Sequence, residues 1–223
     1  MKLVYPKLNI SIELKSNVIN NIVIENNKFF EESIIELNDD ILGKSDNFSL
    51  SDNLESVEIE KEIAMINSPL DFKFEKREVN KRFHAYLKKE LDESELAEEI
   101  NEKYYEIKEI IKRINILSEF AIEYDELIMY ENIFKQFDIH IKNPKGSFVE
   151  KFIDYVNVIY KLTGKRVFVL ANCEAYIDSN ELEYLRKHFE YNEIYILMLS
   201  NKVVELNSNM NTCIIDVDLC EIH

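Results

Sequence analysis

The chain has 223 residues, 46% of them hydrophobic, which is enough to bury one substantial core or one core and a fraction of another. Asp and Glu number 43 against 27 Lys and Arg, and this formal net charge of −16 excludes a uniformly basic nucleic-acid binder, although not a local basic surface. No stretch approaches the roughly 20 apolar residues of a membrane span, so no membrane contact is expected.

The first 70 residues predict strands combined with one helix. Three short apolar runs have the composition of strands, namely residues 3–5, 10–14 and 21–25. An amphipathic helix is expected over residues 28–37. The polar stretch 38–56 predicts a loop or a small hairpin, and residues 60–67 predict a further core strand.

Glycine is scarce, with only Gly43, Gly146 and Gly164. A phosphate-binding loop needs two glycines five positions apart followed by Lys and Ser or Thr, and a dinucleotide-binding turn needs three glycines within six residues. Gly43-Lys44-Ser45 matches the end of a phosphate loop, but Asn38 stands where the first glycine should be. Nucleotide hydrolysis through such a loop is therefore not expected.

From about residue 74 the sequence predicts two long helices, over residues 75–91 and 93–120, without proline or glycine. In the second helix, apolar residues repeat at spacings of four and three, as in a coiled coil: Ile100, Tyr104, Ile107, Ile111 and Ile114. So narrow a seam suits one partner helix, most simply the preceding one in an antiparallel hairpin. Such a hairpin could lie on a domain surface or project as an arm, and the length of the helices favours an arm.

The first of these helices carries a basic stripe. Arg77, Lys81, His84 and Lys88 lie within about 60° of one another on a helical wheel. Six cations of this segment are candidate DNA contacts: Lys73, Lys76, Arg77, Lys81, Arg82 and Lys88. A basic stripe on so acidic a chain suggests sequence-independent contact with the phosphate backbone of DNA. The alternative is a solvated helix face whose cations pair with nearby carboxylates.

An acidic segment follows the second helix and contains Glu119, Glu123, Asp125 and Glu126. Calcium takes six to eight oxygen ligands in irregular geometry, so these carboxylates are candidate calcium ligands. A solvated acidic surface is the alternative. A metal-dependent nuclease is a further possibility, but no nucleophile or orienting histidine is near in the sequence.

The last third returns to alternating helices and strands. Residues 127–137 and 148–162 predict helices, with a short strand over 139–142 between them. Residues 166–200 contain two apolar runs separated by an amphipathic helix, which is typical of a βαβ unit in a parallel sheet. A final strand is expected over 213–217. Cys173, Cys213 and Cys220 form no CxxC pair, which predicts reduced thiols and a cytoplasmic location.

The order of these parts resembles the short form of the accessory spacer-acquisition protein of type II-A CRISPR systems. The patterns that carry the resemblance are Lys2-Leu3, Ile12-Glu13-Leu14, Ile22-Val23-Ile24-Glu25, Glu119 with Glu123-Tyr124-Asp125-Glu126, Phe148-Val149-Glu150-Lys151, Tyr160-Lys161-Leu162-Thr163, Val167-Phe168-Val169 with Asn172, Glu181-Leu182 and Ile196-Leu197-Met198-Leu199. They are strand and charge patterns rather than a catalytic signature, and they span nearly the whole chain.

The resemblance implies an α/β fold with a head like that of P-loop ATPases, in which the nucleotide site is absent, and an inserted helical arm. We expect the head to comprise residues 1–70 and 123–223 and the arm residues 71–122. The resemblance also implies a homotetrameric ring that binds calcium, holds linear double-stranded DNA, and assists the CRISPR integrase complex and effector nuclease in antiviral spacer acquisition without catalysis. The family's calcium-binding segment corresponds to Glu119, Glu123, Asp125 and Glu126. The alternative function is a degenerate ATPase-like scaffold that assembles proteins without binding DNA.

Overall fold

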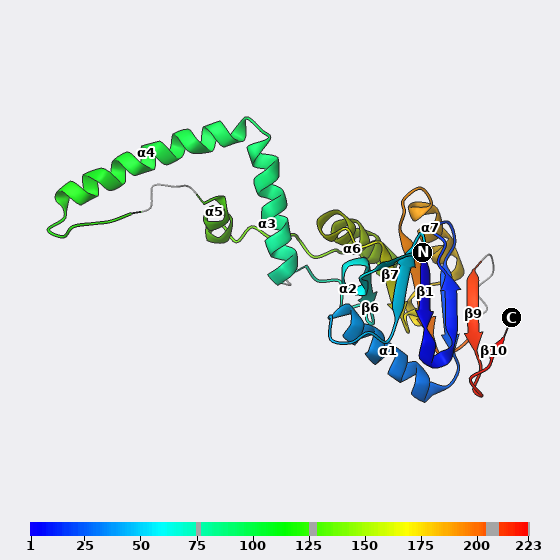
Figure 1. Ribbon diagram of the computed structural model, residues 1–223. Helices are drawn as coiled ribbons and strands as arrows, with labels where there is room; N and C mark the ends of the chain where they lie inside the picture. The colour runs from blue at the N-terminus through cyan, green and yellow to red at the C-terminus, as the bar shows by residue number, and fades with distance from the viewer. Residues whose placement is uncertain (75–76, 125–128, 204–209, 223) are drawn as a thin grey trace. The chain divides into compact units, whose positions relative to one another are not determined.

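The computed structural model describes residues 1–74, 77–124, 129–203 and 210–222 of the chain (Figure 1). The chain divides into two compact units, Met1–Lys73 with Asn143–His223, and Phe74–Lys142. The second unit is therefore an insertion in the sequence of the first. No helix within the described ranges is long and apolar enough to cross a membrane.

A six-stranded sheet forms the centre of the first unit, in the order β10-β9-β3-β8-β7-β6. Its strands are β3 (Asn20–Ile24), β6 (Ile63–Ile66), β7 (Val167–Ala171), β8 (Tyr195–Ser200), β9 (Asn211–Ile215) and β10 (Glu221–Ile222). Neighbouring strands run parallel except for β10, which is antiparallel to β9. The predicted βαβ unit is confirmed, because β7 and β8 are parallel neighbours joined through α7 (Ser179–Phe189).

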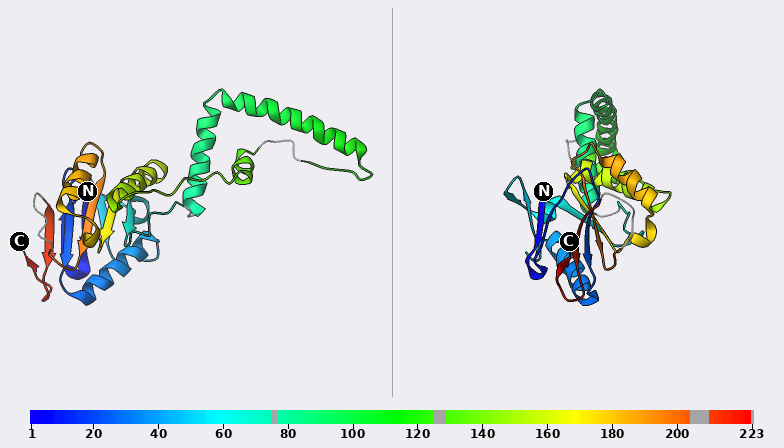
Figure 2. Two further views of the ribbon diagram at one scale, coloured as in Figure 1. Left: turned by 180° about the vertical axis from the view of Figure 1, so that it is seen from behind. Right: turned by 90° about the vertical axis from the view of Figure 1, so that its right-hand side faces the viewer.

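Both faces of this sheet are covered, which explains why β3 and β7 are buried at every residue (Figure 2). On one face, the helix α1 (Asn27–Ile41) and a small second sheet share an apolar core with the strands. On the other face, the helices α6 (Phe148–Thr163) and α7 pack through aromatic rings: Phe152 makes edge-to-face contacts with Phe168 on β7 and Phe189 on α7. An α/β head is thus established.

The small sheet is antiparallel and has the order β2-β1-β4-β5. Its strands are β1 (Lys2–Tyr5), β2 (Ile10–Glu13), β4 (Ser49–Asp52) and β5 (Glu55–Val57), with the 3-10 turn η1 (Pro6–Leu8) between the first two. The hairpin β4–β5 agrees with the hairpin expected within residues 38–56. The predicted strand 60–67 is only half correct, because the short helix α2 (Ile59–Glu62) precedes β6.

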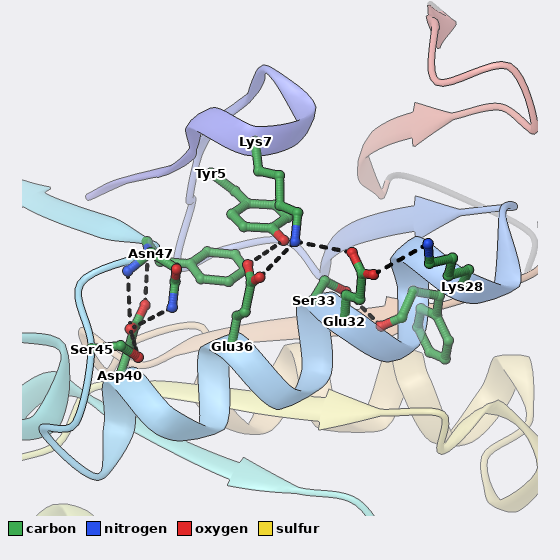
Figure 3. A network of polar contacts seen from close by, with 11 residues as sticks. Tyr5, Lys7, Lys28, Glu32, Ser33, Glu36, Asp40, Ser45 and Asn47 are labelled. Atoms are coloured by element: carbon green, nitrogen blue, oxygen red, sulfur yellow. Dashed lines mark hydrogen bonds and ion pairs between the residues drawn. The ribbon is translucent and has the colours of Figure 1, made fainter.

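A polar network ties the small sheet to α1 (Figure 3). The Tyr5 hydroxyl donates to Glu36 Oε2 at 2.6 Å, and Lys7 Nζ lies 2.6 Å from Glu36 Oε1 and 2.9 Å from Glu32 Oε2. Burial, reinforced by Glu36, raises the pKa of the Tyr5 hydroxyl, so this group remains a hydrogen-bond donor. The Tyr5 ring stacks on Phe48 with centroids 4.0 Å apart. The two sheets and α1 therefore form one core.

Local sequence signals set the helix ends as predicted. Asp178 and Glu181 form a capping box at the start of α7, since each side chain accepts a bond from the other's backbone amide. Gly164 ends α6 with φ +75°, a left-handed conformation that glycine adopts without a steric penalty. Both features depend on neighbouring residues only.

The connection between β3 and α1 lies where a nucleotide-binding α/β protein carries its phosphate loop. Here the Asn26 side chain accepts hydrogen bonds from the amides of Lys28 at 3.2 Å and Phe29 at 3.4 Å. These first-turn amides would otherwise be available to an anion. In this chain they are bonded within the protein.

The second unit contains α3 (Arg77–Asp92), α4 (Leu96–Leu117) and α5 (Tyr130–Gln136). The predicted antiparallel hairpin is wrong, because α4 turns away from α3 at a corner and buries none of its residues (Figure 1). It is α5 that packs beside α3: the buried Phe134 ring of α5 lies 5.4 Å from the His84 ring. The partner of the α3 face is thus a segment about 50 residues further along the chain.

The predicted strand over residues 139–142 is also wrong. The Ile139 amide donates to Phe134 O at 2.9 Å, and the Ile139 carbonyl bonds His84 Nε2 at 2.8 Å, so neither group is available to a strand ladder. The same contacts place α5 and residues up to Lys142 in the second unit. The expected boundary after residue 122 therefore differs from the division that the structure shows.

Candidate nucleic-acid and metal sites

Two cations on α3 are available for a ligand. The side chains of Arg77 and Lys81 are exposed, and neither forms an ion pair with any residue that the structure describes. Four residues apart on one helix, they lie about 40° apart around the axis and about 6 Å apart along it. Lys73 is also exposed, just before the second unit, and Lys76 lies outside the described residues.

Other predicted contacts on α3 are already paired with carboxylates. Arg82 Nε lies 3.1 Å from Glu78 Oε1 on the same helix, and Lys88 Nζ lies 3.5 Å from Glu131 Oε1 on α5. These two cations therefore agree with the alternative interpretation, in which the cations of the helix pair with nearby carboxylates. Within the stripe itself, Arg77 and Lys81 thus form a free half without ion pairs in the described ranges, and Lys88 is paired.

His84 belongs to the same stripe but faces the protein. Its Nε2 atom lies 2.8 Å from Ile139 O, and its ring contacts Phe134. No local pattern in the sequence indicates this contact, because the residues that cover His84 are more than 45 positions away. Periodicity alone places His84 with Arg77 and Lys81, and the structure separates them.

The acidic segment is only partly described. Glu119 and Glu123 are exposed and lie beyond the end of α4, in a stretch without helix or strand, whereas Asp125 and Glu126 lie outside the described residues. Within the described ranges, no three His, Cys, Asp or Glu side chains are grouped so that they could hold a metal ion. Because calcium takes six to eight oxygens, Glu119 and Glu123 could supply only part of a site.

The apolar face of α4, which the sequence predicts to pack in a hairpin, is half-buried at Ile100, Tyr104 and Ile111 and exposed at its other positions. Ile107 and Ile114 of the predicted seam are each 52% exposed, and Leu117 is 84% exposed. Near the corner with α3, a groove of about 340 Å³ is lined mainly by Leu91, Leu96, Ile100, Tyr104, Ile107 and Ile133. An apolar helix face of this length is typical of a surface that contacts another protein.

Comparisons with known proteins agree with this architecture. Residues 40–219 match the family model described as CRISPR-associated protein (Cas_Csn2). The fold is similar to the crystal structure of Stu0660 of Streptococcus thermophilus, with a TM-score of 0.64 over 96% of this chain and 74% of that one. The sequences are 16% identical, so this second similarity concerns the fold alone.

Proposed function

The chain belongs to the Cas_Csn2 family of CRISPR-associated proteins, the accessory family of type II-A systems, and from this premise we propose that it binds linear double-stranded DNA without catalysis and without sequence preference. Membership supports a role in CRISPR adaptation, the capture of foreign DNA in antiviral defence. In the proposal, the protein acts as a calcium-dependent homotetrameric ring that works with the integrase complex and the effector nuclease. Its head is the P-loop-like scaffold of this ring.

The cations on α3 that form no ion pair within the described ranges carry the DNA-binding part of this proposal. Arg77 and Lys81 keep exposed charges on a chain whose net charge is −16. The acidic remainder disfavours indiscriminate binding of nucleic acid, whereas two adjacent cations attract a phosphate backbone. Lys73, Lys76, Arg82 and Lys88 would extend the contact.

The exposed face of α4 supports assembly into a homotetramer. Burying Ile107, Ile114 and Leu117 against another copy would remove large apolar surfaces from water, at about 25 cal/mol per Å². A ring of four copies would also repeat the α3 cations four times, which turns a modest stripe into a multivalent DNA surface.

Calcium enters the proposal through the acidic segment. Glu119 and Glu123 carry no ion pair in the described part of the chain, and together with Asp125 and Glu126 they concentrate four negative charges within eight residues. A divalent cation would neutralise this repulsion.

Gel-shift assays with linear and closed-circular duplexes of the same sequence, in calcium and in chelator, test the proposal. We expect linear DNA to bind in calcium and circular DNA to bind poorly, because a closed ring cannot thread onto a circle. Equal binding of both forms, unaffected by chelator, would contradict the ring and the calcium dependence. Cleavage of the DNA in magnesium or manganese would point to a nuclease instead.

The exposed apolar face of α4 also favours a second candidate, a scaffold that assembles other proteins without binding DNA. The scaffold predicts no duplex binding even at low salt. Mass measurement in solution, with and without calcium, tests the ring: we expect a tetramer in calcium, and a monomer in both conditions would overturn the ring.

A further inference from the structure

The contacts between α3 and α5 suggest how the candidate DNA surface is regulated. We propose that α5 and the segment up to Ile139 compete with DNA for the basic stripe of α3, as an internal cover that the duplex displaces. This inference rests on the proposed DNA binding and adds to it a closed state with lower affinity. Figures 1 and 2 show α5 beside α3, on the side toward which α4 extends.

The first contact covers the centre of the stripe. His84 Nε2 bonds Ile139 O at 2.8 Å, and Phe134, only 5% exposed, lies against the His84 ring. His84 lies within about 40° of Arg77 and Lys88 around the axis of α3, so a duplex that spans these cations must pass over the position that Ile139 occupies. The duplex and this segment therefore cannot both occupy the full stripe.

The second contact occupies a cation at one end of the stripe. Glu131 Oε1 lies 3.5 Å from Lys88 Nζ, where a DNA phosphate would lie in the bound state. A hydrogen bond from its own backbone amide, with the neighbouring Lys88 ammonium, holds the pKa of the Glu131 carboxyl below its usual value. Glu131 is thus an anion at neutral pH and imitates the ligand.

The cover is held weakly enough to be displaced. α5 has seven residues, and Phe134 is its one fully buried side chain within the described part of the helix. Exposed ion pairs such as Lys88–Glu131 contribute little, because water and salt screen them. A duplex that reaches Arg77, Lys81 and Lys88 together can outcompete them. Only open molecules bind DNA fully, so the apparent affinity equals the affinity of the open state multiplied by the fraction of molecules that are open.

Fluorescence anisotropy with a labelled linear duplex, at constant calcium and salt, measures the competition. Glu131→Gln removes the anion while keeping the size of the side chain, and we expect it to tighten binding about two- to fivefold, the range for an exposed ion pair. Glu106→Gln is the matched control, because it makes the same charge change on α4 and releases Lys103, its partner at 3.0 Å. Equal affinities for wild type and Glu131→Gln, or an equal gain in the control, would overturn the competition.

Hydrogen exchange provides a second readout on the unmodified chain. DNA should slow exchange of α3 amides and speed exchange of α5 amides, because displaced α5 loses the α3 surface against which Phe134 is buried. Saturating DNA that leaves α5 exchange unchanged or slower would show that the cover stays in place. If wild type binds no duplex at all, the proposed function fails; if it binds and α5 stays closed, only this inference fails.

Discussion

The free half of the α3 stripe makes a quantitative prediction about salt dependence. Arg77→Gln combined with Lys81→Gln removes two exposed charges, and neither residue forms an ion pair within the described ranges. The double substitution should weaken duplex binding and flatten its dependence on salt. Because both side chains are exposed and their removal leaves no partner unpaired, the fold should be unaffected.

The size of the effect follows from counterion release. Each phosphate contact contributes roughly −0.9 to the slope of log K against log salt, so two lost contacts reduce the slope by about 1.8 for each engaged copy. Between 50 and 200 mM salt, wild type should lose roughly 12-fold more affinity than the double variant.

A second double substitution on α3 serves as the control. Arg82→Gln combined with Lys89→Gln removes the same charge from α3, but these cations pair with Glu78 at 3.1 Å and Glu93 at 3.8 Å. We expect this second variant to change the slope less, because Arg82 and Lys89 already have carboxylate partners within the protein and are less available to DNA phosphates. Anisotropy titrations at four salt concentrations give the slopes. Identical slopes for wild type and Arg77→Gln/Lys81→Gln would place the DNA surface elsewhere.

Three further predictions concern the head. Tyr5→Phe keeps the ring stacked on Phe48 but removes the bond to Glu36, so the free energy of unfolding should fall by about 1–2 kcal/mol in urea titrations. Burial raises the pKa of Glu36, but the hydrogen bonds from Lys7 and Tyr5 outweigh this effect, so the net pKa is lowered. The stabilisation that these bonds provide is therefore present at neutral pH and is lost as the pH falls through the lowered pKa. The difference in unfolding free energy between Tyr5→Phe and wild type should accordingly narrow in acid. Gly164→Ala should cost about 1 kcal/mol from the left-handed backbone alone, because no atom lies within 4 Å of the added Cβ; a larger loss in thermal unfolding would contradict this account. Finally, burial raises the pKa of Cys173 to about 12 and of Cys213 to about 11, so only the exposed Cys220 should react with a thiol reagent near neutral pH until urea is added.

Features that depend on near neighbours were predictable from the sequence. The capping box of Asp178 and Glu181, the glycine that ends α6 and the βαβ unit over residues 166–200 were all expected and are present. The stretch 166–200 was the clearest, because strands covered on both faces must be apolar at every position, and this pattern shows in a single run.

Features that depend on distant partners were not predictable. The seam of α4 indicated a partner helix, and the preceding helix was the simplest choice, but α3 packs with α5 instead. The periodicity of a helix shows that one of its faces is apolar, but it does not show which other element packs against that face. In the same way, the basic stripe of α3 could be read from helical spacing, while its division between free and paired cations could not.

The amino-acid order thus sets the helices, the strands and the charges, since these follow from spacings of a few residues and from the choice of capping groups. Packing across long separations sets which of those charges can meet a ligand. Arg77 and Lys81 remain free because no carboxylate of the described chain reaches them, and His84 and Lys88 are occupied because α5 folds back beside α3. The candidate DNA surface of this protein is therefore a property of its tertiary contacts rather than of its periodicity.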